Sequence, residues 1–214
     1  MRKIFEAELQ AVGDDLTRMA ELVALAMTQA SEALNEGNID LAQRVISEDR
    51  FIDELERNLD ERCILLLAQQ QPVATDLRVV VSALRISASL ERMGDLARHI
   101  ALVARRGYPN NAVPAEFTEL FASMSAAANR VANRIVRLMS SHDLEIGANI
   151  QQDDDVLDDL HAEVFTRVLG ADWAGSAAQT VDLTLLSRYF ERFGDHAVTI
   201  AQRMSYLVTG EFDD

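Results

Sequence analysis

The chain has 214 residues, which suits one large domain or two small ones with room for a core. Apolar residues make up 49%, with only 9 Gly and 3 Pro, a composition typical of helices and not of disorder. The formal charge is −15, from 20 basic and 35 acidic residues, and there is no basic run. This charge argues against direct contact with nucleic acid or anionic lipid. We therefore expect an all-α protein whose partners are proteins.

The apolar segments and the single cysteine of the sequence indicate where in the cell the protein is located. The opening letters MRKIFEAELQ contain no apolar stretch of the kind that a secretory signal carries. No apolar run approaches the roughly 20 residues needed to span a bilayer. The single cysteine, Cys63, excludes a disulfide framework and suits a reducing compartment. We expect a cytoplasmic protein without direct membrane insertion.

Widely spaced Gly, Pro and Asn residues divide the chain into helical segments. The predicted spans are 3–36, 39–70, 73–106, 115–141, 144–169 and 177–209. Apolar residues recur at helical spacing in the second span at Leu41, Val45, Ile52, Leu55, Leu59 and Leu66, and in the third at Ala83, Ile86, Leu90, Met93, Ala97 and Ile100. Helices of about 30 residues are about 45 Å long, and short links make neighbours antiparallel.

The second half of the chain repeats the first. The stretch SLERMGDLARHIA at 89–101 returns as YFERFGDHAVTIA at 189–201, with seven of thirteen letters identical. The letters DRFID at 49–53 align with DDVLD at 154–158, at an offset of 105 instead of 100. A duplicated three-helix unit explains both matches. We predict two tandem three-helix bundle repeats, 1–107 and 112–214, related by a pseudo-two-fold.

Each repeat carries two pairs of carboxylates spaced four residues apart, so that both members share a helix face. The pairs are Asp49 with Asp53, Glu91 with Asp95, Asp154 with Asp158, and Glu191 with Asp195. A solvated acidic face is the simpler explanation, because about five or six such pairs are expected by chance at this acidic content. The alternative is a metal site, since a cation relieves repulsion between like charges. We expect the pairs to line an exposed groove in each repeat.

Glycines and histidines accompany these pairs. Gly94 and Gly194 each cost a helix roughly 1 kcal/mol against alanine, which close approach of a neighbouring helix or ligand would offset. His99, His161 and His196 lie beside the carboxylates and are either further ligands or ordinary helix residues. Oxygen-only donors favour Mg²⁺, Mn²⁺ or iron over a structural zinc site.

The chain resembles the PhoU family over nearly its whole length. The letters that carry the resemblance are QQPVATDLR at 70–78, LERMGDLARHIA and FERFGDHAVTIA. It implies a non-enzymatic regulator that links the ATPase subunit of a phosphate ABC transporter to a phosphate-responsive sensor histidine kinase. Such a regulator represses phosphate-starvation genes when phosphate is plentiful. The family's metal motifs fall on the four pairs, which implies divalent or trivalent ions, and a homodimer is the expected assembly.

Two departures from the family pattern lie near the motifs. His99 and Thr199 stand where the family often has Asn, and GADWAGSAAQTVDL at 170–183 replaces any second copy of QQPVATDLR.

Two other functions remain open at this point. A di-iron carboxylate oxidase requires two Glu-x-x-His elements facing the bundle interior, and the chain offers only Asp158-x-x-His161. A metal-free acidic adaptor would bind a basic partner surface, with an association that weakens as salt rises.

Overall fold

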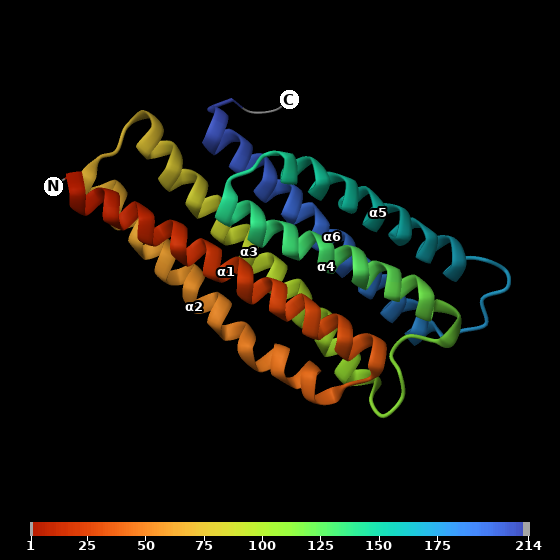
Figure 1. The fold of residues 1–214 in the computed structure, drawn as a ribbon. Coiled ribbons are helices and arrows are strands. Elements are labelled where there is room, and N and C mark those ends of the chain that lie inside the picture. The colour runs from red at the N-terminus through yellow and green to blue at the C-terminus, as the bar shows by residue number, and fades with distance from the viewer. Residues whose placement is uncertain (1, 212–214) are drawn as a thin grey trace.

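A computed structural model describes residues 2–211, which form a bundle of six long helices with no strand among them (Figure 1). The helices are α1 (Arg2–Glu36), α2 (Ile39–Gln70), α3 (Ala74–Gly107), α4 (Thr118–Ser141), α5 (Glu145–Val168) and α6 (Ala177–Thr209). The predicted bounds agree to within one residue, except at the start of α4. There the chain first makes a 3₁₀ turn, η1 (Ala115–Phe117), in which the Phe117 N–H donates to the Pro114 carbonyl at 2.9 Å. Such turns are frequent at helix N-termini.

The helix ends coincide with the polar residues and glycines of the sequence. The Asn38 side chain caps α2 by accepting from the Leu41 N–H at 3.2 Å. Ser176 and Gln179 form a reciprocal capping box at the start of α6. Gly210 ends α6 at a φ of 84°, in the left-handed region where glycine has no steric penalty. These local signals explain why the predicted spans match.

The two repeats pack side by side through four of the helices. In the first repeat α2 packs on α1 and α3, and in the second α5 packs on α4 and α6. The repeats meet where α1 contacts α4 and α3 contacts α6. As a result α2 and α5 lie on opposite flanks of the bundle (Figure 1). The all-α architecture of two three-helix repeats is confirmed.

The two repeated motifs lie next to each other at this junction. The His99 ring of α3 stacks on the Tyr189 ring of α6 with centroids 5.1 Å apart, and Arg106 pairs with Asp182. Numbering therefore rises along α3 as it falls along α6, and the two helices run antiparallel. This register places the LERMGDLARHIA segment level with the FERFGDHAVTIA segment, as a pseudo-two-fold between the repeats requires.

One continuous apolar core runs through both repeats. Every residue of the stripe predicted on α3 is buried, and on α2 only Leu41 and Leu55 remain half-buried. The largest fully buried side chains include Phe117, Phe121 and Phe190 of the second repeat. Within residues 2–211, no helix is long and apolar enough to cross a membrane.

Candidate metal centres

In the first repeat, the acidic pairs of α2 and α3 meet across the seam between these helices. Asp49 of α2 and Asp95 of α3 both contact the guanidinium of Arg98, at 2.6 Å and 2.7 Å. Arg92 contacts the other oxygen of Asp95 at 3.2 Å and Glu91 at 3.4 Å. The structure thus brings Asp49 and Asp95 together around an arginine that the spacing of acidic residues does not reveal.

The other carboxylates of this seam influence one another through their charges. Burial raises the pKa of Asp49 to about 6; Arg98 opposes this rise, and the charge of Asp53 adds to it. Burial also raises the pKa of Glu91, with smaller contributions from Asp53 and Glu56. Glu56 therefore belongs to the same group of charges. Glu56 does form a four-residue pair with Asp60, but this pair does not recur in the second repeat, where the offset of 105 places His161 and Phe165.

In the second repeat, two of the four carboxylates are buried without a full set of partners. Asp154 of α5 is 5% exposed and Glu191 of α6 is 9% exposed. Among the described residues, Asp154 Oδ1 and Glu191 Oε2 have no hydrogen-bond partner. The other oxygen of Glu191 pairs with Arg188, and Asp195 pairs with Arg192 at 3.4 Å. Two desolvated oxygens are left without a donor.

Asp154 is the most perturbed acid of this seam. Burial raises its pKa to about 7, and the charges of Asp158 and Asp195 act in the same direction. Burial and the charge of Asp195 also raise the pKa of Asp158, although Asp158 itself is exposed. The charge of Glu191 also raises the pKa of Asp154, so the other three acids of the repeat all act on Asp154.

The prediction of an exposed groove is wrong for Asp154 and Glu191, and Gly194 provides the physical reason. The Asp154 carboxylate fills the space that a Cβ at residue 194 would need, and Leu157 Cδ1 lies 3.0 Å from that point. Because residue 194 has no side chain, α5 can lie directly on α6 and cover the acids.

Gly94 plays the corresponding role in the first repeat, where a Cβ would lie 2.8 Å from Ile52 Cδ1. Both motif glycines therefore permit close helix packing. Within residues 2–211, no three His, Cys, Asp or Glu side chains form a ready-made metal site.

Two of the three histidines have other partners. His99 stacks on Tyr189 of the opposite repeat, and His161 Nδ1 lies 2.9 Å from Ser187 Oγ. Burial lowers the pKa of His99, His161 and His196, which favours the neutral form of each ring. We therefore interpret His99 as a residue of the repeat junction.

Comparison with known proteins identifies the family. Residues 16–104 and 121–204 each match the family model described as the PhoU domain. The chain belongs to the PhoU family. It is 41% identical over 212 residues to the phosphate-specific transport system accessory protein PhoU homolog 2 of Mycobacterium tuberculosis, covering 99% of this chain and 100% of that one. The PhoU homolog 1 of Mycobacterium leprae is 37% identical, with 100% and 96% covered.

Solved PhoU structures share the fold. A crystal structure of PhoU from Pseudomonas aeruginosa superposes with a TM-score of 0.87 at 30% identity, covering 97% of this chain and 100% of that one. The phosphate transport system regulatory protein PhoU from Streptococcus pneumoniae gives 0.86 at 25% identity, with 98% and 99% covered. The resemblance drawn from the repeated motifs is thereby confirmed.

The metal ions that the PhoU motifs imply can be tested against the side chains of each seam. Carboxylate oxygens suit magnesium, manganese or iron. The unpartnered oxygens of Asp154 and Glu191 fit such a cation, because a positive charge would satisfy both. At the first seam a positive charge is already present in Arg98.

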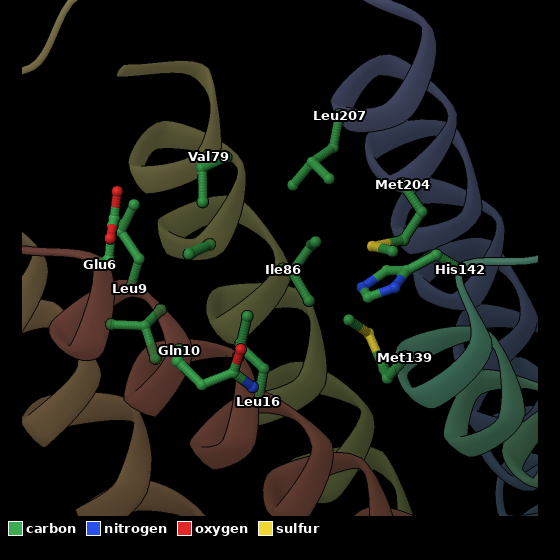
Figure 2. Close-up of a pocket in the computed structure, with 13 residues that line it drawn as sticks. Glu6, Leu9, Gln10, Leu16, Val79, Ile86, Met139, His142, Met204 and Leu207 are labelled. Atoms are coloured by element: carbon green, nitrogen blue, oxygen red, sulfur yellow. The ribbon is translucent and has the colours of Figure 1, made fainter. Parts of the chain in front are cut away.

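The bundle also contains an apolar pocket of about 330 Å³ between the two repeats, lined by residues of α1, α3, α4 and α6 (Figure 2). Met139, His142 and Met204 form one wall, and Leu9 and Leu16 of α1 lie on the opposite side. None of the eight carboxylates of the PhoU motifs lines it. This pocket is therefore separate from the candidate metal centres.

Gly194 offers a test of how tightly α5 covers α6. In Gly194→Ala the added methyl must displace Asp154, whereas Gly13→Ala in α1 places its methyl in open space. We expect Gly13→Ala to raise the free energy of unfolding by about 0.5–1 kcal/mol. The free energy of unfolding of Gly194→Ala should be about 1–3 kcal/mol lower than that of Gly13→Ala, because overpacking offsets the gain in helix propensity. Urea denaturation followed by circular dichroism measures both, and equal stabilisation would contradict the close contact.

Proposed function

We propose that this chain regulates phosphate uptake and phosphate-starvation signalling. It links the ATPase subunit of a phosphate ABC transporter to a phosphate-responsive sensor histidine kinase and represses the starvation response when phosphate is plentiful. The observation that carries the proposal is the full-length match to relatives named as accessory proteins of phosphate-specific transport. The role is regulatory and not enzymatic, and it places the chain in the cytoplasm, where the ATPase subunit and the kinase domain of such systems act.

The second element of the proposal is that metal ions bind at the acidic seams. The candidate ligands are Asp49, Asp53, Glu91, Asp95, Asp154, Asp158, Glu191 and Asp195. The unpartnered buried oxygens of Asp154 and Glu191 support binding of a divalent or trivalent ion such as iron, manganese or magnesium. A bound cation would also relieve the repulsion that raises the pKa of Asp154.

The third element concerns assembly and docking. We propose that the protein forms a homodimer. We also propose that its partners present basic surfaces, because the charge of −15 favours oppositely charged partners. Binding of the ATPase subunit and the kinase should weaken as salt rises. Pull-down of each partner at low and high salt, and sedimentation of the free protein, measure these properties.

The regulatory role is tested by deletion and complementation. Deleting the gene should raise a phosphate-starvation reporter in phosphate-rich medium toward the level of starved cells, because the repressing link is lost. The wild-type chain supplied in trans should restore repression. Unchanged reporter levels in the deletion strain would contradict the proposed role.

The contribution of the metal sites is tested in the same strain. A variant with Glu91 and Glu191 changed to Gln and Asp95 and Asp195 to Asn keeps the apolar stripes and should keep the helical fold. If bound metal is part of the contact with the partners, this variant should lose metal and fail to repress. A folded, metal-free variant that represses normally would show that the metal sites do not carry the regulatory function.

A further inference from the structure

We propose that the two acidic seams are not equivalent: Arg98 is a built-in cation that fills the first seam, and the second seam, which lacks this arginine, is the one that takes a metal ion. The inference rests on the metal binding proposed above and narrows it from both seams to the second one. Gene expression tests the regulatory role, whereas ion binding tests this proposal, so the two can fail separately.

The asymmetry begins with one letter of the repeated motif. At an offset of 100 residues Glu91 matches Glu191 and Asp95 matches Asp195. Three residues after each Asp, however, the first repeat has Arg98 and the second has Val198. The carboxylates of the motif are thus retained in both repeats while the cation is present in only one.

Arg98 is placed where a shared ion would have to bind. Its Nε lies 2.6 Å from Asp49 Oδ2, and its Nη2 lies 2.7 Å from Asp95 Oδ1. One guanidinium therefore joins a carboxylate of α2 to a carboxylate of α3, as a bridging metal would. The contact with Asp95 is a charge-assisted hydrogen bond, and the contact with Asp49 is a close ion pair. An arginine keeps its charge at any pH a protein tolerates. An added cation would have to displace these contacts beside a fixed positive charge.

The second seam shows what is left when the arginine is missing. Val198 is half-buried and carries no charge. Asp154 Oδ1 and Glu191 Oε2 are buried and have no hydrogen-bond donor among residues 2–211. Leaving buried carboxylate oxygens unpaired is unfavourable, and a bound cation would supply the missing partner.

The local arginines do not fill this gap. Arg188 contacts only the oxygen of Glu191 that is already paired, and Arg192 contacts Asp195 at 3.4 Å. The exposed acids Asp158 and Asp195 stand at the edge of the seam, where they can turn toward an entering ion. The second seam therefore offers oxygen donors without a competing guanidinium, a donor set suited to a hard or borderline cation.

Mn²⁺ is a suitable probe, because the electron paramagnetic resonance signal of the free ion is lost on binding. The full-length protein, stripped with chelator, is titrated with Mn²⁺ and its bound metal is counted by elemental analysis. Asp154→Asn should weaken the tight binding by about tenfold or more. The matched change Asp49→Asn in the first seam should alter it by less than about twofold. Both changes are isosteric, so the helical fold should persist, as circular dichroism will check.

Exchanging the two distinguishing residues completes the test. Val198→Arg supplies the second seam with the missing guanidinium and should weaken Mn²⁺ binding by about tenfold or more. Arg98→Val empties the first seam and should add a second class of sites. If either variant fails to fold, the comparison of Asp154→Asn with Asp49→Asn decides alone. Equal losses in those two variants, or no Mn²⁺ binding by the wild-type chain, would overturn the proposal.

Discussion

Replacing Phe190 by alanine should lower the free energy of unfolding by about 3–5 kcal/mol. Phe190 of α6 is fully buried, and its ring packs against Phe121 of α4 with centroids 6.4 Å apart. Its removal leaves a cavity in the continuous core, and long helices packed on several sides cannot collapse to fill it. Urea denaturation measures the loss, and the melting temperature should fall by about 6–20 °C.

The matched control is Phe51→Ala on α2. Phe51 is 41% exposed, so its truncation removes little buried surface and should cost about 0.5 kcal/mol or less. Similar losses at the two positions would mean that α6 does not occupy the centre of the core.

The second large effect is a dependence of stability on pH in the metal-free protein. The pKa of Asp154 is raised from its ordinary value of 3.8 to about 7 by burial and by neighbouring acids. Between these two values the folded chain binds more protons than the unfolded chain. The contribution of Asp154 to the free energy of unfolding therefore falls as pH rises from about 4 to about 7, and levels off above that range. The raised pKa of Asp49, about 6, acts in the same direction.

Asp154→Asn isolates this contribution, because the amide does not titrate. In chelator-treated protein the free energy of unfolding of the variant should increase relative to that of wild type as pH rises. The difference should reach on the order of 2–4 kcal/mol by pH 8. Urea denaturation at a series of pH values measures the difference. Asp159→Asn, at an exposed position of the same helix, should follow the wild-type profile. A constant difference between Asp154→Asn and wild type at every pH would show that Asp154 is not the group responsible.

The sequence by itself determined the elements of the fold and the positions of the acids along each helix. Five of the six helix starts were predicted to within one residue of their observed positions. Helix ends are set locally, by signals such as the Asn38 cap and the capping box at Ser176. The duplication was detectable in the sequence because a two-fold arrangement requires both halves to keep the same contact residues. The start of α4 was missed by three residues, since the 3₁₀ turn before it depends on a weak local preference.

Only the tertiary structure decided what each acid touches. The contact of Arg98 with Asp49 joins residues far apart in sequence, so no local spacing could reveal it. The burial of Asp154 follows from the close packing of α5 over Gly194, which depends on how two helices cross. Helix periodicity places a side chain on a face of its own helix, but the neighbouring helix determines whether that face is exposed, paired or covered. For that reason two seams with the same acidic pattern differ in charge and burial.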